Sequence, residues 1–305
     1  MTQVNLVRRA FLSAVCSAGS ILTANLLCGE EPISRDDLKE PLLRISKKIG
    51  DPPAAGKGHP LDAAIDIANE ALKNIQENIQ DYSAVIVKRE RVSGKLVGPE
   101  YMMAKIRNRK VKDDKVVKPF SVYLYFKKPE EIKGREVIYV EGQNNGKMIA
   151  HEANGWIPAV WLKPEGPIAM RGNLYPITEL GIENLIVKLL EKGHRDRKRD
   201  ECEVEFRKNA KINGRPCTLL NVVHPIRRAY FDFNLAQIFI DDEFKVPIRY
   251  SSYNWPAGQD NNPSPTPSDD TLFEEYTYTN LKLNIGLKDI VFDEKNPEYG
   301  FVKKK

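Results

Sequence analysis

The sequence contains few of the residue types that most often carry catalysis or bind metal ions. Among its 305 residues there are only four cysteines and four histidines. No HExxH, no Cys/His set at zinc spacing, no GxSxG and no GxGxxG after a predicted strand is found, so no motif favours a zinc, serine-hydrolase or dinucleotide site. We therefore predict that the protein is not an enzyme and has no catalytic residue, cofactor or metal ion.

A large excess of charge of one sign is also missing. The 47 lysines and arginines are balanced by 42 aspartates and glutamates, giving a formal net charge of +5, whereas nucleic-acid-binding domains usually carry a large basic excess. A mean hydropathy of −0.46 excludes several membrane spans, because each span needs about 20 mostly apolar residues. We expect a folded globular protein with no nucleic-acid partner.

The first 29 residues have the organisation of a secretory signal peptide. Arg8 and Arg9 precede the apolar stretch 10–27, and the first acidic residue is Glu30. A single membrane anchor is the alternative, although polar residues interrupt the stretch. The arginine pair is compatible with the general secretory route or with twin-arginine export, whereas Leu27 before Cys28 does not match a lipoprotein anchoring site. We predict a periplasmic or otherwise extracytoplasmic protein that is not anchored at Cys28.

Composition divides the rest of the chain into a lead-in and one domain. Residues 30–58 are polar, with proline and glycine clustered near their end, and predict a flexible lead-in. Residues 59–302 form the predicted domain, in which the polar, proline-containing stretch 256–270 is a surface loop. Residues 303–305 are a basic tail.

Within the domain, the spacing of apolar residues changes from helical to extended. A helical stripe predicts a first helix over 61–79. From Tyr82 onward the period becomes two, in segments rich in Val, Ile, Tyr and Phe. A second helix is predicted over 178–192, followed by more strands. This order predicts an α+β fold with a large curved antiparallel sheet and helices on its concave face.

Two cysteines, Cys202 and Cys217, lie outside the leader. An oxidising compartment would permit a disulfide between them. However, Asn213-Gly214 predicts a two-residue hairpin turn that places Cys217 opposite Ala210, too far from Cys202 for a bridge in a regular ladder. The disulfide therefore stays open at this point.

Basic residues gather in two places, at Lys105–Lys118 and at His194–Arg199. Each cluster is compatible with a solvated surface or helix end. Contact with an acidic partner or with anionic lipid headgroups is the alternative, so peripheral membrane contact stays open.

Several spaced blocks together resemble a bacterial exported family known as domain of unknown function 1571. They are YSAVIVKRERVSGKLVGPEYMMAKIR, PFSVYLYFKKPEEIKGREVIYVEGQNNGKMIAHE, YPITELGIENLI, DDEFKVPIRYSSYNWP and the terminal NPEYGF. The resemblance extends from about His59 to Phe301. That family is in turn remotely similar to the lipoprotein-carrier superfamily of LolA, LolB and the RseB sensor domain. The similarity implies a half-open antiparallel barrel with helices in its mouth and an apolar cavity for acyl chains. It implies no catalytic residues.

The first functional hypothesis is an exported binding protein that holds a lipid, an acyl chain or a lipidated protein between the sheet and the first helix. The candidate lining residues are Phe120, Val122, Leu124, Phe126, Val137, Tyr139, Ile238, Ile240, Leu72 and Ile75. For each of them the pattern favours core packing over ligand contact, because carriers and closed cores share it. The charged positions open to a functional role are Glu90, Arg91, Arg107, Arg135, Glu136 and His151; cross-strand charge pairing explains them equally well.

Two other hypotheses remain. A cell-envelope protein-interaction or sensor module without bound lipid would use a sheet edge or the aromatic residues Trp156, Trp161 and Trp255, expected to be exposed, against a protein partner. A hydrolase would require two carboxylates that face each other in a cleft.

Overall fold

The computed structural model of the protein describes residues 41, 43–44, 58–153 and 158–301. All of them belong to one compact unit, Ser34–Lys305. The predicted signal peptide 1–29 with Cys28, most of the lead-in 30–58, Trp156 and the tail 303–305 lie outside the described residues.

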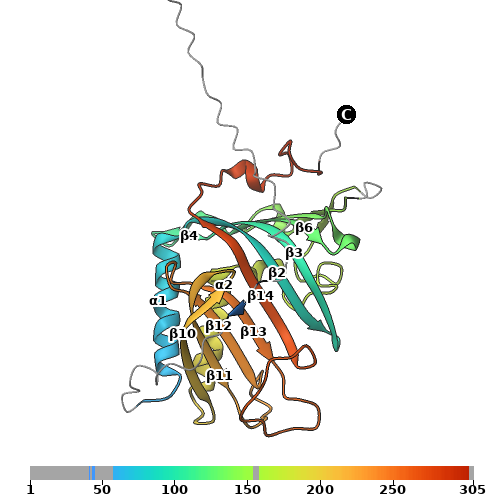
Figure 1. The fold of residues 1–305 in the computed structure, drawn as a ribbon. Helices are drawn as coiled ribbons and strands as arrows, with labels where there is room; N and C mark the ends of the chain where they lie inside the picture. The colour runs from blue at the N-terminus through green and yellow to red at the C-terminus, as the bar shows by residue number, and fades with distance from the viewer. Residues whose placement is uncertain (1–40, 42, 45–57, 154–157, 302–305) are drawn as a thin grey trace, which may run out of the picture. The chain divides into compact units, whose positions relative to one another are not determined.

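The described residues form two α-helices and a large set of strands (Figure 1). The helices are α1 (Asp62–Asn78) and α2 (Ile182–Asp196), and short 3-10 turns are η2 (Glu130–Ile132), η3 (Asn144–Gly146), η4 (Ile177–Glu179) and η5 (Asp289–Phe292). The strands are β1 (Leu43–Arg44), β2 (Asp81–Val92), β3 (Lys95–Arg107), β4 (Lys110–Lys112), β5 (Lys115–Lys118), β6 (Ser121–Lys128), β7 (Glu136–Val140), β8 (Met148–His151), β9 (Val160–Leu162), β10 (Glu203–Ile212), β11 (Arg215–Val223), β12 (Leu235–Asp241), β13 (Pro247–Tyr253) and β14 (Leu272–Leu283).

Twelve of the described strands form one antiparallel sheet, and β4 and β5 form a separate hairpin. The order in the sheet is β1-β10-β11-β12-β13-β14-β2-β3-β6-β7-β8-β9. The last described strand, β14, therefore pairs with the first long one, β2, in the middle of the sheet. Since β1 and β9 stand at opposite ends, the sheet is open. The predicted α+β fold with a large curved antiparallel sheet is confirmed.

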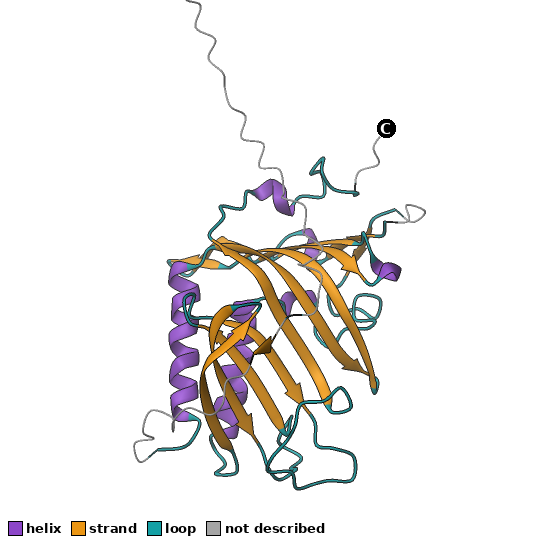
Figure 2. Ribbon diagram, in the orientation of Figure 1, coloured by secondary structure: helices purple, strands orange, loops and turns teal. Residues whose placement is uncertain are grey.

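The connection from β9 to β10 determines what covers the concave face. These strands follow one another in sequence but lie toward opposite ends of the sheet. The chain between them therefore has to cross the sheet, and it does so on the concave side as an irregular segment, η4 and α2 (Figure 2). The helix α1 packs against α2 on the same side.

The helix α1 forms where the sequence predicts it, and its apolar stripe is buried. Leu61, Ile65, Ile75 and Ile79 all belong to the buried core, and each square ångström of apolar surface removed from water contributes about 25 cal/mol. The predicted second helix is displaced. It begins at Ile182 rather than at residue 178, because η4 precedes it and Gly181, with φ of 112°, interrupts the helical backbone.

On the convex face, the C-terminal segment covers the strands β6 to β8. The rings of Tyr123 and Tyr299 stack with centroids 4.1 Å apart, and Phe292 packs into the same cluster. The buried carboxylate of Glu136 accepts hydrogen bonds from the Tyr123 hydroxyl at 2.8 Å and from the Gly300 amide at 2.6 Å. This side of the sheet is therefore closed over these strands.

Candidate functional site

A cavity of about 570 Å³ lies under one half of the sheet, between its concave face and the connection from β9 to α2. Pockets for small ligands typically measure about 300–1,000 Å³. The apolar floor on the strands consists of Met102, Leu124, Phe126, Val137, Met148, Ala150, Val160 and Leu162. The apolar roof consists of Pro164, Ile168, Ala169, Pro176, Ile177, Leu180, Leu185 and Leu189.

The floor is continuous because alternate residues of neighbouring strands point to the same side of the sheet. In the ladders that join β3, β6 and β7, Met102 lies opposite Phe126 and Leu124 lies opposite Val137. The residue between Leu124 and Val122, Tyr123, points to the convex side and packs under the C-terminal segment. One strand, β6, therefore serves the cavity with one face and the convex cluster with the other.

The roof leaves space because most of it is irregular. Between β9 and α2 the chain contains turns and the single 3-10 turn η4, and Pro164 and Pro176 lack the backbone donor that regular structure needs. Ile168 lines the cavity yet is 68% exposed, so the cavity opens to solvent beside it. The start of α2 is held more firmly, since the Ile182 amide donates to the buried Tyr82 hydroxyl at 2.9 Å.

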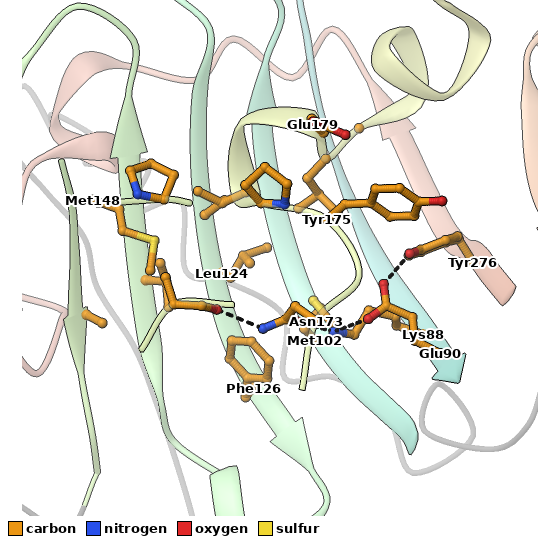
Figure 3. Close-up of a pocket in the computed structure, with 18 of the residues that line it drawn as sticks. Lys88, Glu90, Met102, Leu124, Phe126, Met148, Asn173, Tyr175, Glu179 and Tyr276 are labelled. Carbon is orange, nitrogen blue, oxygen red and sulfur yellow. Dashed lines mark hydrogen bonds and ion pairs between the residues drawn. The ribbon is translucent and has the colours of Figure 1, made fainter. Parts of the chain in front are cut away.

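One end of the cavity is polar (Figure 3). Lys88 Nζ lies 3.5 Å from Glu90 Oε2 and 3.0 Å from Glu100 Oε2, and it donates to Asn173 Oδ1. Glu90 also accepts a hydrogen bond from the Tyr276 hydroxyl. Lys88 and Glu90 are both buried, and buried charges are tolerated when they are paired and hydrogen-bonded.

A second buried carboxylate stands directly across the ladder from the first. Glu274 is the register partner of Glu90, and it accepts hydrogen bonds from the Tyr250 hydroxyl at 3.2 Å and the Ser252 hydroxyl at 3.3 Å. Lys192 Nζ lies 3.7 Å from Glu274 Oε1. Burial, together with the charge of Glu274, raises the pKa of Tyr250 well above its usual value, so this hydroxyl remains a donor.

These two glutamates are neighbouring carboxylates at one end of the cavity, so they are the pair to compare with the two facing acids that a hydrolase would require. Each of them is, however, already hydrogen-bonded and close to a lysine. Satisfied buried groups of this kind favour an organising role over proton transfer. We therefore do not assign catalysis to Glu90 and Glu274.

The other half of the concave face is nearly filled. There α1 and α2 pack over β11, β12 and β13 and leave a space of only about 70 Å³. Its walls are almost entirely apolar, with Ile65, Ile186 and Ile238 among them. The two apolar stripes of the helices therefore close this half of the sheet.

The sequence profile of a family described as "Protein of unknown function (DUF1571)" matches residues 79–301. The chain belongs to this family. The match begins at the end of α1 and includes α2 and every described strand of the large sheet except β1. The family predicted from the spaced sequence blocks is thus confirmed. No curated protein matches the chain.

Several solved structures are similar to this DUF1571 protein. A DUF1329 family protein from Desulfovibrio piger is 13% identical with a TM-score of 0.37, over 77% of this chain and 98% of the other. A LolA superfamily protein from Nitrosomonas europaea is 8% identical with a TM-score of 0.28, over 75% and 96%. The MucA/MucB complex of Pseudomonas aeruginosa contains a chain that is 14% identical with a TM-score of 0.38, over 75% and 60%. No function is transferred from similarities of this size.

The predicted lining residues of the DUF1571 protein fall into three groups. Leu124, Phe126 and Val137 line the larger cavity. Ile238 and Ile240 line the small space under the helices. The remaining five pack in or against the main core, namely Phe120, Val122, Tyr139, Leu72 and Ile75. Ligand contact at any of the ten stays a prediction.

The larger cavity does not lie where the sequence placed it. The expected position was between the sheet and the first helix, but the described lining includes no residue of α1. The reason is that the apolar stripe of α1 packs against α2 and the strands β11 to β13. The cavity lies instead under the segment 158–181, which carries apolar residues without a regular period and gave no recognisable signal.

The six charged positions selected from the sequence are not brought together. Glu90 and Arg135 line the cavity, whereas Arg91 donates from Nε to the Leu272 carbonyl at 2.8 Å. On the convex side, His151 Nδ1 lies 3.9 Å from Glu136 Oε2. Arg107 pairs there with Asp289 and lies over the Phe292 ring. No pattern in the sequence indicated that Glu274 would pair with Glu90 across the ladder.

The two cysteines of the domain are free thiols. The predicted pairing of Cys217 with Ala210 is present in the hairpin of β10 and β11, which keeps Cys217 away from Cys202. Burial, aided by nearby carboxylates, raises the pKa of each thiol to about 12. Both are therefore protonated and unreactive at neutral pH.

Of the tryptophans expected to be exposed, Trp161 on β9 is 40% exposed. Trp255 is buried, because its side chain packs inward and its indole N–H donates to the Pro225 carbonyl at 3.4 Å. The expectation for Trp255 was therefore wrong.

Within the described ranges, no group of three or more His, Cys, Asp or Glu side chains is placed to hold a metal ion. None of the helices in the same ranges combines the length and the apolar character that crossing a membrane requires.

Proposed function

We propose that this protein is an exported, non-enzymatic binding protein that takes an amphiphile into its larger cavity. The ligand class is a lipid or the acylated end of a lipidated protein. The observation that carries the proposal is the two-part character of the cavity. Most of its wall is apolar, and the buried cluster around Lys88, Glu90 and Glu274 makes one end polar.

Each part of the cavity matches one part of such a ligand. Acyl CH₂ groups that leave water for the floor around Leu124 and Phe126 contribute about 0.8 kcal/mol each. The tyrosine, asparagine and lysine side chains at the polar end supply hydrogen-bond partners for a headgroup. The opening beside Ile168 gives the ligand a route that does not require α1 to move.

Native mass spectrometry of the protein purified from its own cell envelope tests this proposal. The wild type should carry a co-purifying acyl lipid and should take up a fluorescent fatty acid in titration. Leu124→Trp, which fills the floor, should lose both. Ile285→Trp adds the same side chain at an exposed position outside the cavity and should behave as the wild type. A wild type that carries no lipid and binds no acyl probe would overturn the proposal.

A protein-interaction module is the second candidate, and β9 favours it. This strand is an edge of the sheet, and its Val160 and Trp161 are 38% and 40% exposed. An exposed edge strand offers unpaired backbone groups to a partner strand. Cross-linking in envelope fractions should then capture one stoichiometric protein, and Trp161→Lys should abolish the capture while leaving acyl binding intact.

A further inference from the structure

In the sequence, the hairpin of β4 and β5 connects β3 to β6. It pairs with no strand of the large sheet. In its register Lys110 lies opposite Lys118, Val111 opposite Val116 and Lys112 opposite Lys115. Because side chains alternate between the faces of a strand, the four lysines share one face and the two valines share the other. The hairpin is therefore amphipathic, with the additional Val117 at its bulge.

The intramolecular contacts of the hairpin do not explain this composition. Val111, Val116 and Val117 are 58%, 54% and 53% exposed, so they gain little from folding. The lysine pairs place like charges directly opposite each other, which destabilises a hairpin. Among the described residues, Lys112 and Lys115 have no hydrogen-bond or ion-pair partner, whereas Lys118 is close enough to Asp289 to help lower the pKa of that carboxyl, after the larger effect of Arg107.

The base of the hairpin is fixed, in contrast to its outer part. Arg109 forms an ion pair with Glu141 through Nε at 2.8 Å, and Lys110 donates to the Gln76 carbonyl at the end of α1. At the tip, Asp113 and Asp114 have φ of 50° and 56°, a conformation that aspartate tolerates in a two-residue turn. These acids are explained by the turn, and residues 109–118 still carry a net charge of +3.

In the second basic cluster, His194–Arg199, basic side chains form ion pairs within the protein. Arg195 pairs with Asp196 and Asp232, and Arg197 pairs with Asp62. That cluster ties the end of α2 to its neighbours. Lys112 and Lys115 of the hairpin, by comparison, are exposed and have no ion-pair partner among the described residues, so they remain available to a partner.

We propose that the β4–β5 hairpin is a docking element for an anionic lipid bilayer. The valine face enters the boundary between headgroups and acyl chains, and the lysine face lies at the level of the phosphates. A bilayer surface presents negative charge directly above apolar material, which is the combination that this hairpin complements. This proposal does not depend on the cavity, whose lining does not include the hairpin.

Vesicle co-sedimentation tests the proposal. The full domain should bind vesicles of phosphatidylcholine mixed with phosphatidylglycerol, should not bind pure phosphatidylcholine vesicles, and should lose binding at high salt. Lys112→Glu with Lys115→Glu should weaken binding at least about tenfold, as expected when two charges near an anionic surface are reversed. Lys95→Glu with Lys245→Glu makes the same charge change at two exposed positions outside the hairpin and should leave most of the binding.

The valines need a separate variant, Val111→Ser combined with Val116→Ser and Val117→Ser. If the valines insert into the bilayer, this variant should bind vesicles more weakly although its charge is unchanged. In a protein that keeps the other valines, the fluorescence of a probe attached at residue 117 should shift to the blue on vesicles. Circular dichroism should show every variant folded, since the hairpin lies outside the sheet. Two results would overturn the proposal: a wild type that does not bind anionic vesicles, or a control pair that loses as much binding as the hairpin pair. Leu124→Trp should bind vesicles normally, which separates this test from that of the cavity.

Discussion

The two halves of the concave face are built from similar strands but are covered in different ways. Over β11 to β13, the helices α1 and α2 bring two regular apolar stripes together and leave about 70 Å³. Over β2 to β9, the cover is the turn-rich segment 158–181 with one side of α2, from Leu185 to Lys192, and about 570 Å³ stays open. Regular helices can match the spacing of a sheet side chain by side chain, whereas an irregular segment with prolines cannot. We infer that the cavity results from what covers the sheet and not from the sheet itself.

The largest loss of stability on truncating a side chain is expected in the half that the regular helices cover. Ile75 on α1 is fully buried, so Ile75→Ala should remove packing on all sides and cost about 4 kcal/mol of unfolding free energy. Urea unfolding followed by circular dichroism measures this. A loss below about 1 kcal/mol would contradict the closed packing of this half.

Truncating a side chain on the open half should lower the unfolding free energy by a smaller amount. Leu124→Ala removes a side chain that already faces the cavity on one side, so fewer contacts are lost and the expected cost is about 2 kcal/mol. The comparison with Ile75→Ala in the same urea experiment is the matched control. If both variants lose the same stability, the open half is filled in solution and the distinction between the halves fails.

A smaller, pH-dependent effect should be confined to the closed half. His224 is fully buried near the C-terminal end of α2, with Nδ1 3.1 Å from the Phe233 carbonyl oxygen and Nε2 3.5 Å from Asp196 Oδ2. Burial lowers its pKa, and this outweighs the opposing attraction of Asp196. The folded protein therefore binds a proton less readily than the unfolded chain, whose histidine titrates near pH 6.5.

This difference in proton affinity sets the direction in which stability changes with pH. The contribution to stability is complete above about pH 6.5 and decreases as the pH falls from there through the lower pKa of the folded state. His224→Gln should remove this part of the pH dependence, so the difference between its urea midpoints on the two sides of pH 6.5 should be smaller than in the wild type. Equal pH dependence in both proteins would show that other groups cause it.

Much of the architecture could be predicted from periodicity. The stripe from Leu61 to Ile79 and the change of period at Tyr82 are local patterns. Such patterns predict helices and strands correctly when one face of the element is buried. The start of α2 was predicted four residues too early because the predicted range included Gly181, whose φ of 112° is incompatible with a helix. The pairing of Ala210 with Cys217 was correct because a two-residue turn fixes the register of a hairpin.

The candidate site could be predicted only in part. Leu124, Phe126 and Val137 were selected because alternation places them on one face of β6 and β7, and all three do line the cavity. Ile75 and Leu72 were selected because helical spacing places them on the apolar stripe of the first helix, yet α1 packs over the closed half. Periodicity identifies the buried face of a strand or a helix, but it contains no information on what lies opposite that face.

By itself, the sequence determined most of the elements, although not β1, which lies in the predicted lead-in. It also determined the α+β class, the family and the absence of recognisable catalytic motifs, because these depend on residues close together in the chain. Only the tertiary structure decided that β14 pairs with β2, that Glu274 therefore stands opposite Glu90, and that the link from β9 to β10 must cross the concave face. These facts depend on the order of strands across the sheet. That order follows from long-range packing, which no local pattern of residues records.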